Sequence, residues 1–562
     1  MSDAAVRHEV LDTTKSFCVT APAGSGKTSL LTQRVLALLV TVERPEQVLA
    51  ITFTRKAAAE MRERVMEALD AAKQGIQAEN EHEARTYSLA DAVLAHSRAL
   101  NWSLTAESLN IRTIDGLAAQ LNRVMPVLSG LGGGITVTDD VLPLYQKATS
   151  ELYELIGEES SRGEALRQLL LSMDNNWQRC SELLLELLGR RADWLPELGQ
   201  HTDPEGASQR LTATVQAVIS ERLSALTETI DAHWLSDLEH QANAAVGRLT
   251  AYVASGLVEP QKVDIPVDPI QLSTEAAQLC SWQWVVRWIL TGDEKPRKRL
   301  DKNNGFQAKV DQTAKDDVLG LISKLEERTD WLDLLIEIAY LPRTTSDDQE
   351  WQGVLHLSRV LPTLAAQLLT VFRSRGVVDH THIAMSAEAA LGTDEEPTDL
   401  ALRLDYQLAH ILVDEFQDTS QGQYRLLEKL CRGWSEHNHM NPRHPRTLFI
   451  VGDAMQSIYG FRYADVGLFL RAREEGIAGV LLNDRSLSRN FRSQAGVIDW
   501  VNRQFSSIVP KYGDRRLGVV PMTIAEATRS EGLEQAVEIH NFPDDQVRET
   551  NFVFSRICKL LS

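Results

Sequence analysis

A short stretch near the start of the chain combines small residues with one lysine and one threonine, a pattern that wraps polyphosphates. In such a loop backbone N–H groups surround the phosphates, the lysine reaches the outer phosphates, and the hydroxyl binds Mg²⁺. Lys27 and Thr28 are placed for those two roles. The predicted phosphate loop comprises Ala21, Pro22, Ala23, Gly24, Ser25, Gly26, Lys27 and Thr28.

Paired carboxylates end an apolar stretch much further along the chain. Asp414 and Glu415 directly follow Ile411–Val413. Asp414 is placed to hold a metal ion, and Glu415 to orient or deprotonate a water molecule, which are the two tasks that phosphoryl transfer requires. Together with the phosphate loop they predict nucleotide hydrolysis.

Strand and helix patterns surround the phosphate loop. Phe17–Thr20 reads as a short apolar strand that enters it, and Ser29–Val40 as an amphipathic helix whose N-terminus faces the phosphates. Val48–Thr52 reads as a second buried strand, followed by a helix from Lys56 to about Ala72. This alternation predicts a parallel α/β sheet.

From roughly Pro126 to Arg375 the pattern changes to long Leu- and Ala-rich helices. Eight of the eleven tryptophans fall there: Trp177, Trp194, Trp234, Trp282, Trp284, Trp288, Trp331 and Trp351. We expect Trp284 and Trp288 to be core residues, because they lie four apart on one helical face. Strands then return at Ile411–Val413, Leu448–Val451 and Val480–Leu482. A helical insertion within one sheet domain explains why the two halves of the nucleotide site are so distant in sequence.

Aromatic, basic and amide residues follow these strands in polar turns. Singly, Phe53, Tyr459 and Phe461 would be interpreted as core residues. Their neighbours, which include Lys56 and Arg462, favour contact with nucleic-acid bases and phosphates instead. Further on, Phe491 stands beside Arg492, a pair suited to the face of a base and to a γ-phosphate.

Composition narrows the class of protein. The 562 residues allow several domains, and 43% hydrophobic with 24% charged residues is typical of a soluble globular protein. We find no signal peptide and no run of about 18 apolar residues that could span a bilayer, which favours the cytoplasm and no membrane partner. Five scattered cysteines argue against a disulfide framework or a zinc site. The net charge of −20 argues against broad coating of nucleic acid but allows a local basic groove.

The order of these blocks resembles the UvrD/Rep-type superfamily one DNA helicases, and within them the AddA and RecB branch. The blocks are, in order, Ala21–Thr28, Thr52–Arg64, Ile111–Asp115, Val413–Thr419, Val451–Arg462 and Asn490–Ser493. The resemblance implies that the cofactors are ATP and Mg²⁺ and that Glu415, Gln456 and Arg492 are the catalytic residues. Gln456 would couple the γ-phosphate to DNA. Arg492 would contact the γ-phosphate from a second RecA-like domain, and Phe491 would stack on adenine.

The resemblance also implies the partners of this chain. These are single-stranded DNA, single-strand/double-strand junctions and an AddB-like nuclease/helicase partner. The residues that it assigns to DNA are Phe53, Thr54, Arg55, Lys56, Thr113, Tyr459, Phe461 and Arg462.

The expected fold is α/β: a RecA-like P-loop parallel sheet interrupted by a large all-helical insertion, plus the start of a second RecA-like domain. The expected boundaries are 1–125 and 376–488 for the two parts of the first RecA-like domain, 126–375 for the insertion and 489–562 for the incomplete second domain.

Three departures from the family pattern change the expectation for activity. No glutamine that could read adenine precedes Gln33. The block that carries a second arginine for the γ-phosphate and the metal-binding nuclease signature are both missing before Ser562. Because such an arginine contributes about 10³ to 10⁵ in rate, we expect a truncated chain that is weakly active alone.

Three hypotheses follow. The first is an ATP-dependent DNA helicase or translocase of UvrD type in double-strand break repair or recombination. The second is a non-catalytic ATP- and single-strand-binding module of a repair complex. The third is another P-loop ATPase, with protein substrates. Stimulation of ATP hydrolysis by single-stranded DNA separates them.

Overall fold

The computed structural model of the chain describes residues 3–124, 136–199, 204–344, 349–393, 396–460, 463–509, 520–530, 537–542 and 546–561. The chain forms two compact units. The first unit comprises Met1–Val141, Gly189–Asp193 and Phe372–Ser562, and the second comprises Leu142–Leu188 and Trp194–Val371. The predicted boundaries at 125, 375 and 488 stay predictions.

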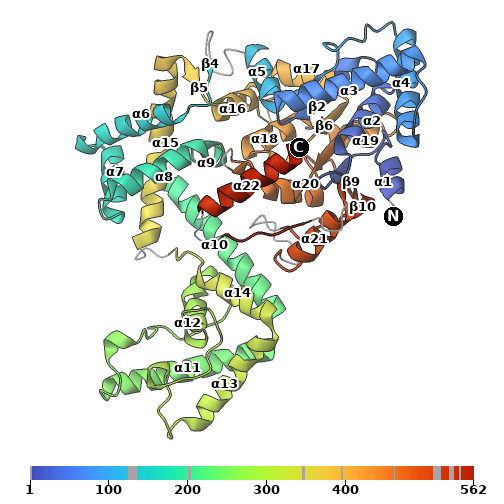
Figure 1. Cartoon of the computed structure of the whole chain (residues 1–562). Helices are drawn as coiled ribbons and strands as arrows, with labels where there is room; N and C mark the ends of the chain where they lie inside the picture. Colours follow the sequence, from blue (N-terminus) through green and yellow to red (C-terminus); the bar gives the residue numbers. More distant parts are fainter. Residues whose placement is uncertain are drawn as a thin grey trace. The chain divides into compact units, whose positions relative to one another are not determined.

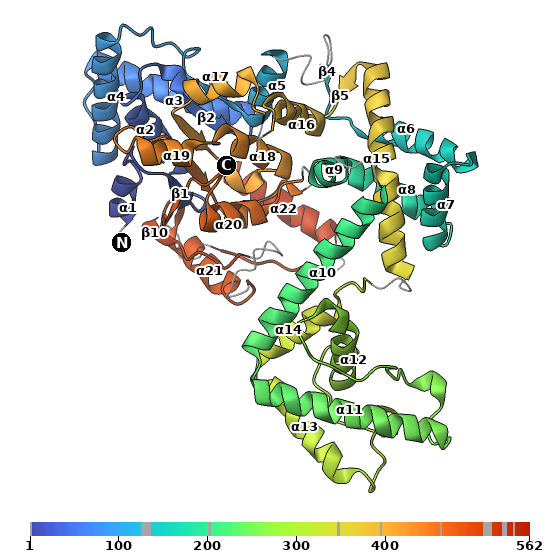
Figure 2. The ribbon, with the colours of Figure 1, turned by 180° about the vertical axis from the view of Figure 1, so that it is seen from behind.

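A parallel sheet forms the centre of the first unit (Figures 1 and 2). It has six strands in the order β3-β2-β6-β7-β1-β8. Its strands are β1 (Phe17–Thr20), β2 (Val48–Thr52), β3 (Ile111–Thr113), β6 (His410–Val413), β7 (Thr447–Gly452) and β8 (Asn483–Ser486). Every residue of β1, β2, β6 and β7 is buried, as expected of parallel strands covered by helices on both faces. The predicted α/β fold is confirmed.

Helices cover both faces of this sheet. Phe17, Val19 and Phe449 alternate along β1 and β7 and share one hydrophobic core with α2, α3 and α4. On the opposite face, Phe416 packs against Tyr424 of α18 and Phe469 of α20. The helices of this unit are α1 (Asp3–Glu9), α2 (Lys27–Leu39), α3 (Arg55–Gln74), α4 (Glu81–Ala99), α5 (Ile114–Val124), α16 (His380–Ala390), α17 (Asp399–Gln407), α18 (Gln421–Leu430), α19 (Trp434–Met440), α20 (Val466–Glu475), α21 (Ala495–Phe505) and α22 (Gln546–Leu561).

Helix α3 shows how the local sequence sets its limits. The Thr54 hydroxyl accepts the N–H of Ala57 at 3.1 Å and caps the first turn, and Gly75 ends the helix in the left-handed region at φ 67°. Between them Ala58, Met61 and Val65 form a buried stripe at helical spacing. The helix therefore starts directly after the turn that follows β2.

One predicted strand is wrong. Val480–Leu482 is not a strand, because Val480 makes an isolated bridge to Ile477 and Leu481 is 73% exposed. The strand at this edge is the polar β8, which pairs with β1 from Phe17↔Asn483 to Thr20↔Ser486.

Short parallel pairs lie outside the main sheet. β4 (Thr136–Val137) pairs with β5 (Val377–Val378), so the stretch that we expected to be all-helical from 126 includes a strand. β9 (Arg489–Gln494) pairs with β10 (Glu526–Arg529), and α21 lies against both.

Helices joined by loops make up the second unit, and the part of it that the structure describes contains no named strand. Its helices are α6 (Leu142–Tyr153), α7 (Ser161–Ser172), α8 (Trp177–Gly189), α9 (Arg191–Gly199), α10 (Pro204–Thr229), α11 (Ala232–Ala254), α12 (Leu279–Ile289), α13 (Gln312–Glu327), α14 (Thr329–Ala339) and α15 (Gln349–Arg375), of which α8, α9 and α15 extend into the first unit. Helices α11 to α14 share one core that contains Trp234, Trp282 and Trp331. Trp284 and Trp288 are buried in the same core, as predicted. Their rings stack, with the ring centres 5.7 Å apart.

Helix α15 is long and apolar enough, by length and composition alone, to cross a membrane, with a mean hydropathy of 1.3 over 18 residues. The expectation that the chain has no such stretch was therefore wrong. A core helix of a soluble protein passes the same test. Leu361, Leu364 and Leu368 lie on one buried stripe of α15, and 39% of the apolar window is buried.

Candidate functional site

All the predicted site residues that the structure describes follow the carboxyl ends of sheet strands or lie on β9 next to them. The phosphate loop follows β1, Phe53 follows β2, Thr113 ends β3, Asp414 follows β6, and Gly452 ends β7. Ligands of parallel α/β sheets bind at this edge. Phe461 and Arg462 lie outside the described residues.

The phosphate loop needs glycine at two positions. Gly24 and Gly26 have φ angles of 76° and 75°, in the left-handed region that disfavours a side chain. A Cβ atom on Gly24 would also lie only 2.7 Å from Oδ1 of Asn490. The loop closes through the bond from Ser25 N–H to the Pro22 carbonyl at 3.0 Å, and α2 begins at Lys27. The loop therefore presents its N–H groups at a helix N-terminus, the arrangement that binds phosphate.

Lys27 brings the two halves of the predicted nucleotide site together. Its Nζ lies 2.5 Å from Oε2 of Glu415 and 3.8 Å from Oδ1 of Asp414. Thr28, the next residue, lies half-buried in the first turn of α2. The structure thus places Lys27, Asp414 and Glu415 together at the sheet edge, and the role of Thr28 beside them stays a prediction.

Asp414 is a strong candidate for a cation ligand. Burial raises the pKa of its carboxyl to about 6, against the lowering effect of the Lys27 ammonium on the same pKa. A desolvated carboxylate is stabilised by a nearby cation. The side-chain oxygen of Ser25, a further oxygen in the phosphate loop, is buried without a hydrogen-bond partner among the described residues. These oxygen donors fit magnesium and a polyphosphate.

A hydrogen-bond path leads from Glu415 to Gln456. Nε2 of Gln417 donates to Oε2 of Glu415 at 2.8 Å, and Oε1 of Gln417 accepts the N–H of Asp453 at 3.0 Å. Nε2 of Gln456 then donates to Oδ2 of Asp453 at 2.5 Å. A Cβ on Gly452 would lie 2.3 Å from Gln417 Oε1, so a side chain there would displace the Gln417 amide from this position. The path physically joins the carboxylate pair to the turn after β7.

That turn carries Tyr459, which meets Phe53 of the turn after β2. Their ring centres lie 4.4 Å apart at an interplanar angle of 39°. Ile458, beside Tyr459, is 71% exposed. Arg55 and Lys56 are exposed in the first turn of α3. Aromatic and basic residues therefore gather at the same sheet edge, as a single-strand site requires.

Two of the predicted DNA-contact residues have structural bonds. The Thr54 hydroxyl caps α3, as described above, and the Thr113 hydroxyl accepts the N–H of Gly116 at 3.0 Å in the first turn of α5. Their assignment to DNA stays a prediction.

Strand β9 is bonded to the phosphate loop. Nδ2 of Asn490 donates to the Ala23 carbonyl at 2.7 Å, and the N–H of Phe491 donates to the Gly24 carbonyl at 2.8 Å. Oδ1 of Asn490 accepts the N–H of Arg492 at 2.9 Å. The Arg492 side chain is exposed beside the loop, with its Cβ 2.8 Å from a Cβ placed on Gly24.

Comparison with known proteins identifies the family of the chain. A family model described as the UvrD/REP helicase N-terminal domain matches residues 2–265 and 289–476. The chain belongs to this family.

Relatives of this UvrD/REP-family chain include AddA proteins, each named as one subunit of an ATP-dependent helicase/nuclease. That of Exiguobacterium sibiricum is 26% identical over 525 residues, which cover 87% of this chain and 38% of the relative. That of Desulfitobacterium hafniense is 28% identical over 539 residues, covering 89% and 35%. That of Latilactobacillus sakei is 26% identical over 544 residues, covering 92% and 55%. The chain therefore spans little more than a third of the first two relatives, and the resemblance to the AddA branch is confirmed.

The UvrD/REP-family site also contains a residue that no sequence pattern indicated, Arg7 of α1. Its guanidinium donates to the carbonyl of Ser25 in the phosphate loop, and its Cζ lies 5.3 Å from the ring centre of Phe491. Two further contributors, Gln417 and Asn490, stood within recognised blocks, but their bonds could be known only from the fold.

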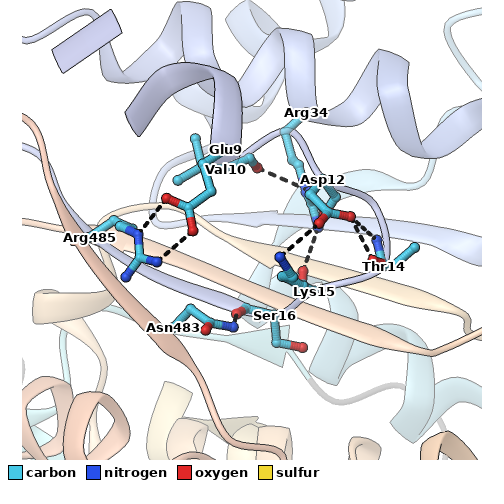
Figure 3. Close-up of polar contacts among 9 residues, drawn as sticks. All are labelled: Glu9, Val10, Asp12, Thr14, Lys15, Ser16, Arg34, Asn483 and Arg485. Carbon is cyan, nitrogen blue, oxygen red and sulfur yellow. Dashed lines mark hydrogen bonds and ion pairs between the residues drawn. The ribbon is translucent and has the colours of Figure 1, made fainter. Parts of the chain in front are cut away.

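A polar cluster holds α1 and the chain that enters β1 (Figure 3). Arg485 of β8 donates to Glu9 at 2.8 Å. The fully buried Arg34 of α2 donates to the carbonyls of Val10, Asp12 and Lys15 at 3.0, 2.6 and 2.9 Å. These bonds fix the segment that precedes the phosphate loop, and with it the position of Arg7.

Proposed function

We propose that this chain hydrolyses ATP with Mg²⁺, weakly when it is alone, and couples the hydrolysis to movement along single-stranded DNA, as a helicase or translocase. The observation that carries the proposal is the meeting of Lys27 with Asp414 and Glu415 at the edge that also holds Phe53 and Tyr459.

The residues divide the chemical work. Lys27 exchanges its carboxylate partners for phosphate oxygens, which frees Glu415 to accept a proton from the attacking water. Asp414 and Thr28 would hold magnesium, which when bound neutralises charge on the phosphate oxygens. Phe491 would stack on the base, and Arg492 would contact the γ-phosphate.

The bonded path from Glu415 to Gln456 supports coupling to DNA. A strand that contacts the turn after β7 would move Asp453 and Gln456, and Gln417 would transmit the movement to Glu415. A path of bonds is a hypothesis of coupling until the coupling is measured.

The experiment compares ATP hydrolysis by the purified 562-residue chain with and without oligothymidylate. We expect stimulation in the native chain and loss of that stimulation, with ATP binding kept, in Gln456→Ala. Equal stimulation in that variant would refute the assigned role. Binding of both ligands without turnover would support the non-catalytic module instead, and hydrolysis indifferent to DNA would support a protein-directed ATPase.

We also propose a partner protein, a pathway and a location for this chain. Relatives are named as part of a helicase/nuclease, which supports an AddB-like partner and a role in double-strand break repair or recombination. A cytoplasmic location is proposed from the sequence alone. Co-purification of the chain with a second protein of this kind from its own cell would test the first of these.

A further inference from the structure

Arg7 is held rigidly beside the phosphate loop. Its Nε donates to Oδ2 of Asp3 at 2.6 Å, and its Nη2 donates to the carbonyl of Ser25. The side chain of Asp3 is only 2% exposed, and its Oδ1 accepts the N–H groups of Ser488 and Arg489 at 3.0 and 3.3 Å. The guanidinium is therefore fixed between α1, the loop and the start of β9.

Arg7 and Phe491 flank the same point of the loop. A Cβ placed on Gly26 would lie 3.7 Å from Nη1 of Arg7 and 3.8 Å from Cδ2 of Phe491. The guanidinium lies over the Phe491 ring, and that ring is 43% exposed. Two flat groups, one aromatic and one cationic, thus stand next to the residue that precedes Lys27. Flat aromatic and guanidinium groups are the ones that stack on nucleobases.

We propose that Arg7 is the second wall of a clamp on the nucleotide base, opposite Phe491. The inference rests on the proposed ATP site. A base held between two flat groups needs about 7 Å between them, which is two contacts of about 3.5 Å. Because Asp3 and Ser25 hold Arg7, the exposed Phe491 ring is the wall that moves outward to admit the base.

The clamp has a consequence for selectivity. Asp3 and Ser25 take two edges of the guanidinium, so Arg7 meets the base with its face. Stacking tolerates every base, because each has a π-face. We therefore expect this site to bind GTP within about tenfold of ATP, which fits the lack of a glutamine ahead of Gln33.

The test measures binding of ATP, GTP and inorganic triphosphate, each with Mg²⁺, to the full chain. Arg7→Ala should lower the affinity for ATP and for GTP about tenfold, which is the scale of one stacking contact. The affinity for inorganic triphosphate should stay unchanged. If Arg7 only supports the loop through Ser25, the affinities for all three ligands will fall by the same factor, and the clamp is refuted. A native chain that prefers ATP over GTP by about a hundredfold or more would refute the selectivity, since stacking alone cannot discriminate so strongly.

Further variants separate the clamp from loss of structure. Arg7→Lys keeps the charge and can still pair with Asp3 but lacks the flat face, so it should behave like Arg7→Ala toward ATP. Phe491→Ala should show the same ligand pattern, and the double variant should lose less than the sum, since both walls grip one base. Arg485→Ala removes only the pair with Glu9, while Asp3 and Ser25 still hold Arg7, so it should change the ATP-to-triphosphate ratio much less than Arg7→Ala does. A native chain that binds none of the three ligands would refute the ATP site itself.

Discussion

The two ends of the parallel sheet differ in the surroundings of their buried polar side chains. At the amino end, His410 lies 2.8 Å from the hydroxyl of Thr447 and 3.2 Å from that of Thr41, and Ser16 accepts the N–H of Leu448 at 3.0 Å. At the carboxyl end, Asp414 is buried with a raised pKa, and the Ser25 hydroxyl is buried without a partner among the described residues.

The backbone at the carboxyl end includes left-handed residues at the site itself. At the carboxyl end Glu415, a residue with a side chain, has a φ of 53°, and the two phosphate-loop glycines have positive φ as well. Strained backbone and unsatisfied polar groups persist where a ligand completes them. The comparison teaches that one end of the sheet holds the fold together while the other is arranged for binding. Substitutions at the two ends should therefore have separable effects.

The largest expected effect is at the carboxyl end. Lys27→Ala should lower ATP hydrolysis by about 10³-fold or more, because a positive charge on the phosphates is lost. Steady-state hydrolysis and binding of labelled ATP would measure the change. Lys15→Ala, which removes an exposed lysine paired with Asp12, is the matched control and should change neither. Normal hydrolysis by Lys27→Ala would contradict the assignment of nucleotide binding to the carboxyl end of the sheet.

A large effect on stability, rather than on hydrolysis, is expected at the amino end. Arg34→Met should lower the free energy of unfolding by about 3 kcal/mol, since three carbonyls lose a charged donor in a buried place. Urea unfolding would measure the loss. The affinity of the folded variant for ATP should fall by no more than the roughly tenfold loss expected of Arg7→Ala, because Arg34 reaches the site only through the segment that carries Arg7. The same replacement at exposed Arg55 should cost under about 0.5 kcal/mol, and a similar cost at both sites would contradict the assignment of stability to the amino end.

An intermediate effect is expected at the aromatic pair. Phe53→Ala should weaken binding of oligothymidylate by about 1 to 3 kcal/mol, the value of one stacked base. Anisotropy of a labelled oligonucleotide would show it, while hydrolysis without DNA should remain as in the native chain. Phe505→Ala, which removes an exposed ring in α21, is the control. If both variants bind the oligonucleotide equally well, Phe53 packs against Tyr459 and does not contact DNA.

The smallest expected effect concerns pH. Burial lowers the pKa of His410 to about 3 in the folded chain, whereas an unfolded histidine titrates near about 6.5. The unfolded chain therefore binds the extra proton first, and stability falls as pH drops below about 6.5, by about 1.4 kcal/mol per unit from this residue. His410→Gln should flatten the dependence of unfolding free energy on pH between about 6.5 and 5. An unchanged slope would show that His410 is not held neutral.

The sheet could be predicted from sequence where apolar runs meet polar turns. Phe17–Thr20 and Val48–Thr52 are observed with the predicted bounds, and α3 differs from its prediction by about one residue at its start. Because parallel strands end at one edge, the meeting of Lys27 with Asp414 followed from the strand pattern.

Other features depend on tertiary context. The β8 strand, Asn483–Ser486, is polar and largely exposed, and only its pairing with β1 makes it a strand. The more apolar Val480–Leu482 was therefore chosen wrongly. Arg7 carries no signal in its spacing, and its place at the loop depends on Asp3 and on the polar contacts that hold α1.

The pairing of β2 with β6 sets the order in which the site can be made during synthesis. Thr52 and His410 enclose roughly 360 residues, and closing such a loop costs about 5 kcal/mol of chain entropy. At about 5 to 20 residues per second, roughly 20 to 70 s pass between translation of β2 and of its neighbour. Through that interval the N-terminal strands have no partner in the centre of the sheet. A ribosome-bound chain is thus exposed to aggregation or chaperone capture until β6 emerges.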